Sequence, residues 1–199
     1  MIEGITGQHT SAVRRLQIVT IGWMTVELLV ALISGIQARS VALTTFAGDS
    51  AVELLSAIVV LLRFRLGPGA EARASRINGM LLYALAGYVV LSSVFSLVSK
   101  RLKPESSLVG ICLLLAAAMI MPILGAAKKR LAKATRSGAL RADAAQSNIC
   151  AYMSWIALAG LVLNATFHIP WADSIAALFL LPLILREAHE ARQGETCDC

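Results

Sequence analysis

Long apolar runs, separated by short polar connections, set the pattern of this chain. Five runs are long enough to cross the ~30 Å hydrocarbon core of a bilayer as helices. They occupy residues 16–36, 41–62, 77–98, 107–127 and 140–163. A sixth run, 171–185, has only 15 residues, and it spans if flanking side chains reach the interface or the bilayer thins. The pattern predicts an all-α, polytopic membrane protein with six transmembrane helices.

The composition agrees with this prediction. Hydrophobic residues make up 57% of the 199 residues and charged residues 15%, against about 45–50% and about 25% in soluble domains. The first apolar run is too long for a cleaved signal peptide, and the first few residues of the chain are not basic. We predict a cytoplasmic N-terminal segment over 1–13, a six-helix transmembrane domain over 14–187, and a short cytoplasmic tail over 188–199.

The formal net charge of +6 reports topology rather than a nucleic-acid partner. Most lysines and arginines fall in alternate connections, and basic residues favour the cytoplasmic side of a membrane. This places both termini in the cytoplasm of a multi-pass protein of the cell membrane. The basic segment KRLKPE at 100–105 is the exception. There is no GxxxxGK[ST] phosphate loop, so we do not expect transport driven directly by ATP on this chain.

Two carboxylates interrupt the second apolar run. Asp49 and Glu53 lie four residues apart, hence on one face of a helix and roughly 6 Å apart along it. A charge at mid-depth costs roughly 3 kcal/mol or more, so it persists where it faces a partner, a cavity or an ion. At least one of two such close carboxyls holds a proton unless a cation lies between them. No Lys or Arg lies near mid-depth in any predicted helix, and this favours a divalent-cation site that exchanges with protons.

The fifth run carries a second polar stripe. It consists of Asp143, Ser147, Cys150 and Ser154, with Gln146 beside it. A thiolate favours soft or borderline ions such as Zn²⁺, Cd²⁺ or Cu⁺. The alternatives are that Cys150 is a small buried hydrophobe and that the serines and the amide hydrogen-bond between helices. Asp143 could equally cap its helix or pair with Arg141 or Lys133.

Three further features carry candidate chemistry. Glu27 lies near the middle of the first run, either as a proton-linked group or as a partner in helix packing. Asp173 opens the sixth run, where we expect it to cap that helix. Cys197 and Cys199 form a C-x-C tail that could capture Cu⁺ or Zn²⁺, although two thiols alone make an incomplete site. The alternative is a tail with no essential role.

The order of these segments resembles a known family. The acidic pair in AGDSAVELLS, the LRAD entry to the fifth helix and the WADSIAALFL opening of the sixth together resemble the transmembrane domain of the cation diffusion facilitators. The resemblance covers roughly residues 14–190, and it is nearest to the short branch that lacks the C-terminal cytoplasmic domain. It implies a homodimeric antiporter that exports Zn²⁺ or a related divalent ion in exchange for protons.

The resemblance also implies a ligand set. Asp49 and Glu53 match the helix 2 ligands, and the helix 5 ligands fall on Gln146 and Cys150, where His and Asp are usual. This replacement points to a softer substrate, altered coupling or a non-transporting relative. Asp143 and Glu27 would support the ligands or carry protons.

We therefore expect a divalent metal cation transporter for Zn²⁺ or a softer relative. Its partners would be metal ions, protons, the lipid bilayer and a second copy of the chain. We expect no tightly bound cofactor beyond the transported ion, no nucleic acid and no enzymatic activity. One alternative is a non-transporting metal-binding or regulatory membrane protein. The other is an intramembrane enzyme that uses Asp49, Glu53 and Cys150, for which the sequence offers no sign of a substrate pocket.

Overall fold

The computed structural model describes residues 2–66, 68–99, 105, 107–135 and 138–193, which form six helices. These are α1 (Ile2–Ala38), α2 (Val41–Leu66), α3 (Pro68–Ser99), α4 (Leu108–Thr135), α5 (Gly138–Phe167) and α6 (Pro170–Gln193). The prediction of an all-α chain is confirmed. The tail cysteines, Cys197 and Cys199, lie outside the described residues.

Five of these helices are long and apolar enough to cross a membrane, which indicates a multi-pass membrane protein. The spans are Ser11–Ala38, Val41–Val59, Gly79–Val98, Leu108–Thr135 and Asp143–Phe167. They match the first five predicted runs. Helix α6 is not one of the five within the part of the chain that the structure describes, so its crossing stays a prediction.

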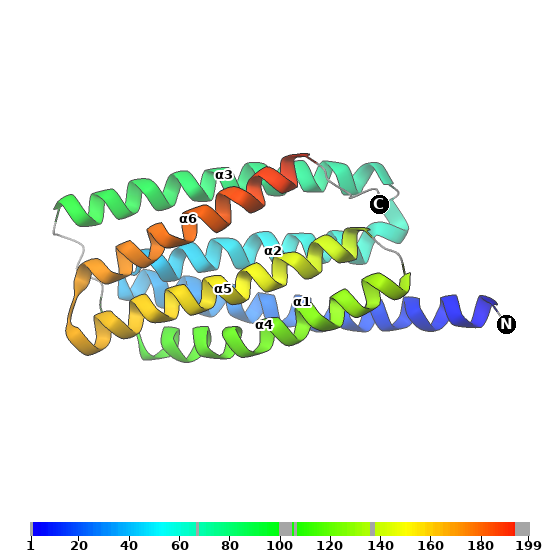
Figure 1. The fold of residues 1–199 in the computed structure, drawn as a ribbon, viewed down its shortest axis with the longest axis horizontal. Helices are drawn as coiled ribbons and strands as arrows, with labels where there is room; N and C mark the ends of the chain where they lie inside the picture. Colours follow the sequence, from blue (N-terminus) through cyan, green and yellow to red (C-terminus); the bar gives the residue numbers. More distant parts are fainter. Residues whose placement is uncertain (1, 67, 100–104, 106, 136–137, 194–199) are drawn as a thin grey trace.

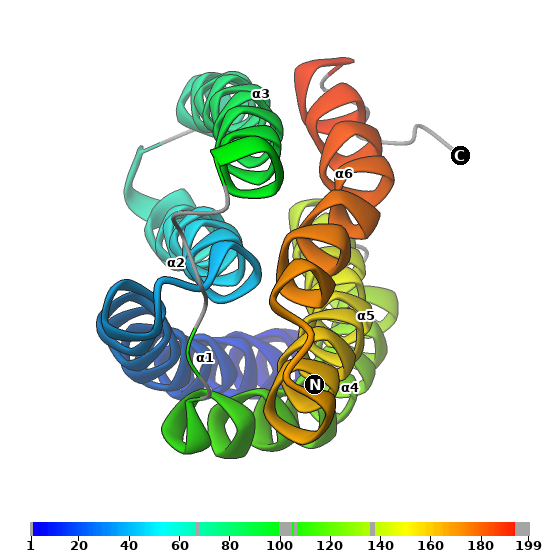
Figure 2. The same ribbon diagram turned by 90° about the vertical axis from the view of Figure 1, so that its left-hand side faces the viewer.

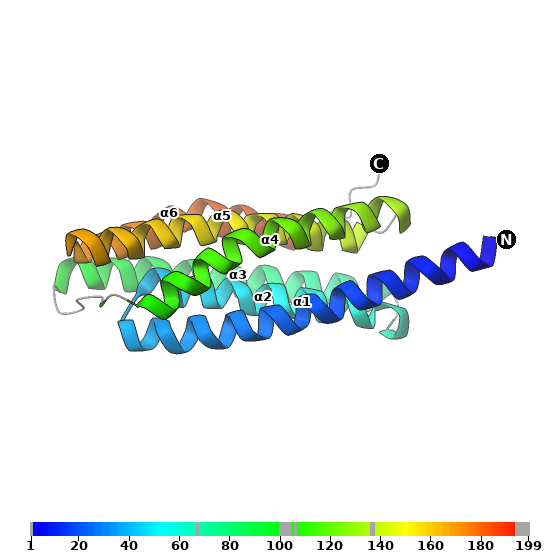
Figure 3. The ribbon, with the colours of Figure 1, turned by 90° about the horizontal axis from the view of Figure 1, so that it is seen from below.

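The helices form an elongated bundle (Figure 1). Seen end-on, α1, α2, α4 and α5 lie together, and α3 and α6 lie above α2 and α5 (Figure 2). Helix α4 crosses the bundle obliquely, from beside α1 towards α5 (Figure 3). Since α2 contacts α1, α3, α5 and α6, groups from several helices can approach its carboxylates.

The outer faces of α1 and α3 are apolar. Leu91 and Met80 of α3, and Val19 and Ile36 of α1, are among many large hydrophobic side chains that no other part of the fold covers. In a bilayer such side chains face lipid, which is as apolar as they are. This exposed apolar surface therefore fits a membrane-embedded bundle.

The α1–α2 turn is held by a residue from the far end of the chain. The carboxylate of Asp173 accepts hydrogen bonds from Ser40 Oγ (2.5 Å) and from the backbone N–H groups of Val41 (2.7 Å) and Ala42 (3.3 Å). The expectation that Asp173 caps its own helix was therefore wrong: it caps the first turn of α2. This contact fixes the start of α6 beside the start of α2.

A tight connection makes that capping possible. Arg39 has a positive φ of 52°, and the Ser40 N–H donates to the Gly35 carbonyl at 3.0 Å, closing α1. A Cβ on Gly35 would lie 2.8 Å from Thr44 Cγ2, so glycine lets α1 and α2 approach closely there. We call this end of the bundle the Ser40 end, and the opposite end the Arg186 end.

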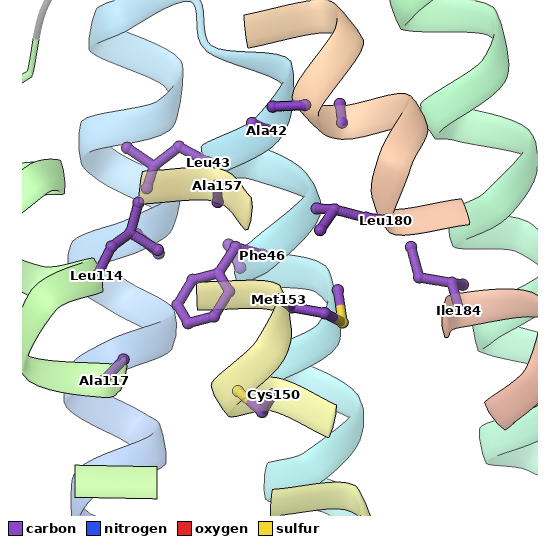
Figure 4. Close-up of a cluster of buried hydrophobic side chains, with 14 of the residues drawn as sticks. Ala42, Leu43, Phe46, Leu114, Ala117, Cys150, Met153, Ala157, Leu180 and Ile184 are labelled. Carbon is purple, nitrogen blue, oxygen red and sulfur yellow. The ribbon is translucent and has the colours of Figure 1, made fainter. Parts of the chain in front are cut away.

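A layer of apolar side chains fills the bundle on the Ser40 side of the acidic residues (Figure 4). Phe46 of α2, Leu114 of α4, Met153 of α5 and Leu180 of α6 all have no exposed surface. Because α2 runs away from Ser40, Asp49 and Glu53 follow Phe46 by about one and two turns. The layer therefore separates the α2 carboxylates from the Ser40 end. We call it the apolar layer.

Candidate cation site

Asp49 of α2 is one of two buried acidic residues in the described bundle whose carboxylate oxygens both lack a hydrogen-bond partner. It is wholly buried, and neither carboxylate oxygen has a hydrogen-bond partner among the described residues. An ionised carboxylate without partners is very costly to bury. The side chain therefore either holds a proton or faces a cation.

Glu53 lies one turn further along α2 and is also wholly buried. Its Oε1 accepts a hydrogen bond from Ser147 Oγ at 2.5 Å and lies 3.4 Å from Lys128 Nζ. Its Oε2 has no partner in the described part of the chain. One oxygen of Glu53 is thus held by α4 and α5, and the other is available to a ligand.

Lys128 of α4 lies at the centre of this network with no exposed surface. Its ammonium lies 3.0 Å from Asp143 Oδ1 and 2.7 Å from Ser147 Oγ. The sequence-based expectation that no Lys or Arg neutralises the α2 carboxylates was therefore wrong. The reason is that α4 continues to Thr135, so that Lys128 stays inside the bundle instead of opening a loop.

Asp143 joins three helices. Besides Lys128, it accepts a hydrogen bond from Gln17 Nε2 of α1 at 2.7 Å. Arg141 and Lys133, the partners weighed from sequence, are exposed. Since both oxygens of Asp143 have partners, this residue supports the network and offers no free ligand atom.

Glu27 of α1 lies beside Cys150 of α5. The Cys150 thiol is 3.6 Å from Glu27 Oε1, which also accepts a hydrogen bond from Ser50 Oγ at 2.8 Å. The indole N–H of Trp23 donates to Glu27 Oε2 at 2.7 Å. Both carboxylate oxygens of Glu27 are therefore partnered, and the thiol faces carboxylates.

The α5 stripe faces the interior as its spacing predicts. Its four members, Asp143, Ser147, Cys150 and Ser154, have no exposed surface. Gln146 is only half-buried, and no hydrogen bond joins it to the α2 carboxylates in the part of the chain that the structure describes. The side chain that bonds Glu53 from α5 is Ser147.

Glu187 of α6 completes the group and was missed in the sequence, where it stood at the end of the predicted domain. It is 7% exposed, and both its oxygens lack a partner among the described residues. Its negative charge is repelled by the charges of Asp49, Glu53 and, more weakly, Glu190. The signal was available, because Glu187 lies three residues after Ile184 and seven after Leu180, on the same buried face of α6.

Charge in this region does not balance. Five buried carboxyl groups face one buried ammonium, that of Lys128, within the described residues. They are Glu27, Asp49, Glu53, Asp143 and Glu187. In these residues no three His, Cys, Asp or Glu side chains converge closely enough to hold a metal ion. To bind a cation, these side chains would therefore have to move closer to one another.

A comparison with known protein families finds no match to this chain, and neither does a comparison with curated proteins.

Proposed function

We propose that this chain is a proton-coupled transporter of a divalent metal cation, similar to the cation diffusion facilitators. The observation that carries the proposal is Asp49, whose two buried oxygens lack partners while Oε2 of neighbouring Glu53 is also free. A buried acceptor that the protein itself leaves unsatisfied supports a site whose occupant comes and goes.

The proposed site lies between α2 and α5. Asp49 and Glu53 act as anionic ligands, Cys150 as a thiolate and Gln146 as a weak fourth ligand. The thiolate biases the site towards Zn²⁺, Cd²⁺ or a similarly soft ion. Gln146 has to turn inward from its half-buried position. Asp143 and Glu27 hold the surrounding helices through their hydrogen bonds or lie on the proton path.

Proton coupling follows from the same pair. When the cation leaves, Asp49 and Glu53 lose the charge that allowed both to be ionised, so a proton binds in its place. When a cation enters, that proton is released. One ion movement is thus linked to an opposite proton movement, and helices rocking about the site alternate its access.

The wider setting is part of the proposal. Both termini are cytoplasmic in the cell membrane, α6 is the sixth span, and export is the direction of transport. Two copies of the chain form the working unit through membrane helices. Cys197 and Cys199 capture metal at the cytoplasmic side. The chain is not an enzyme.

A non-transporting metal-binding or regulatory protein is the alternative, and one contact favours it. Lys128 lies 3.4 Å from Glu53 Oε1, so a tethered ammonium already supplies part of the charge that a transported cation would bring. In that case the carboxylates would hold an ion without moving it.

Metal flux into sealed proteoliposomes tests the proposal. Zn²⁺, Cd²⁺, Mn²⁺ and Cu⁺ are offered with and without an imposed pH gradient, using the wild type, Asp49→Asn, and the exposed-site control Glu190→Gln. We expect gradient-dependent flux of at least one ion, lost in Asp49→Asn and kept in Glu190→Gln. Metal binding without flux of any ion would support the alternative instead.

A further inference from the structure

We propose that Glu187 of α6 is a ligand of the transported cation and supplies a third carboxylate beside Asp49 and Glu53. This inference rests on the proposed function, and it changes the ligand set from one shared by two helices to one shared by three. In this set Glu187, rather than Gln146, joins Cys150 and the α2 pair.

Glu187 is left without a partner although a cation stands next to it in the sequence. Arg186 is exposed and pairs instead with Glu190, with 2.8 Å between Arg186 Nε and Glu190 Oε1. Arg186 and Glu190 thus form an ordinary solvent-exposed ion pair between residues one turn apart on a helix. Glu187, between them in sequence, is buried, whereas Arg186 and Glu190 are exposed.

The direction of Glu187 follows from the face of α6 on which it lies. Leu180 and Ile184 precede it on that face, and both are fully buried. Figure 4 shows their side chains directed into the core that α2 and α5 share with α6. Continuing this face by one turn carries Glu187 past the apolar layer, into the region of the α2 carboxylates with which it interacts.

The resulting donor set suits a borderline divalent ion. Three carboxylates and one thiolate offer four anionic donors, as tetrahedral Zn²⁺ and Cd²⁺ sites use oxygen and sulfur ligands. The three carboxylates carry five oxygen atoms without a partner among the described residues, two each on Asp49 and Glu187 and one on Glu53. Gln146, by contrast, makes no hydrogen bond to the α2 pair among the described residues. Because the groups have not converged, binding would draw α6 towards α2.

A matched pair of variants on one helix tests this. Glu187→Gln and Glu190→Gln make the same chemical change three residues apart, one at the buried and one at the exposed carboxylate. Zn²⁺ and Cd²⁺ binding to the purified full-length chain is measured by calorimetry in detergent, with helix content and elution volume as checks of folding. We expect Glu187→Gln to weaken binding by at least about 10-fold, because losing even a hydrogen-bond partner of a metal ligand costs about 10- to 100-fold in affinity, and Glu190→Gln to leave it unchanged.

The possible results separate the two proposals. Wild-type affinity in Glu187→Gln, with binding lost in Asp49→Asn, would overturn the ligand role while the transported-cation site stands. No binding and no flux in the wild type would overturn both. If Glu187→Gln does not fold, Glu187→Asp keeps the charge but shortens the side chain. Its affinity should then fall several-fold, and an unchanged affinity would count against the ligand role.

Discussion

The ammonium of Lys128 lies 3.0 Å from a carboxylate oxygen of Asp143, and neither side chain has any exposed surface. This ion pair joins α4 to α5 inside the bundle. Breaking a buried pair by removing one partner costs about 3–5 kcal/mol, whereas replacing both is often close to neutral. We therefore expect Lys128→Met to lower the free energy of unfolding by about that amount, and Lys128→Met/Asp143→Asn to lower it less. Reversible unfolding in mixed micelles measures both.

The neighbouring Lys129 is exposed and provides the control. Lys129→Met should change the free energy of unfolding by about 0.5 kcal/mol or less, as exposed substitutions usually do. If the effects of Lys128→Met and Asp143→Asn simply add in the double variant, the two side chains do not act as a pair.

Lys128 also shows why the sequence alone did not predict every residue of the site. The five long apolar runs were found because hydrocarbon thickness sets a minimum length that composition reveals directly. The fourth run was ended at residue 127, so Lys128 fell in the basic stretch after it, and Glu187 was the last residue of the predicted transmembrane domain. Helix ends in a bundle can remain buried beyond the apolar run. In the sequence, charged residues at such helix ends have the pattern of a solvent-exposed connection.

The same limit applies to partners across helices. The α5 stripe follows from helical periodicity, and its four members are indeed buried. Periodicity within one helix does not say which neighbouring helix a side chain meets. Asp173 capping α2, and Ser147 rather than Gln146 bonding Glu53, depend on how separate helices pack. One sequence without an alignment carries no direct record of such contacts.

Cys150 should give the site its preference for soft ions. In a background with Cys197 and Cys199 replaced by Ser, Cd²⁺ should produce a sulfur-to-metal charge-transfer absorption band in the ultraviolet that Cys150→Ala removes. The preference for Cd²⁺ over Mn²⁺ should fall in the same variant, because Mn²⁺ favours oxygen ligands. Cys112→Ala is the control, since Cys112 is exposed. A band that survives Cys150→Ala would place the bound ion elsewhere.

Asp173 should contribute to the stability of the fold but not to the affinity for the cation. Its carboxylate accepts three hydrogen bonds at the start of α2, and bonds to a charged acceptor contribute about 1.5–3 kcal/mol each. Asp173→Ala should therefore lower the free energy of unfolding by about 2 kcal/mol or more. Its affinity for Zn²⁺ in calorimetry should match that of the wild type, because Asp173 lies at the Ser40 end. A large loss of affinity would mean that this cap also shapes the cation site.

Phe46 should keep the cation site closed towards the Ser40 end. It is the largest fully buried side chain in the described bundle and belongs to the apolar layer that lies on that side of Asp49 (Figure 4). Replacing Phe46 with alanine leaves a cavity that the surrounding helices only partly fill. Water can enter this cavity because it lies beside the buried carboxylate of Asp49. We expect Phe46→Ala to raise metal-independent proton leak into vesicles, measured with a trapped pH-sensitive dye. Phe179→Ala, at an exposed phenylalanine of α6, should leak no more than the wild type. Equal proton leak in all three proteins would show that the apolar layer excludes protons without the Phe46 side chain.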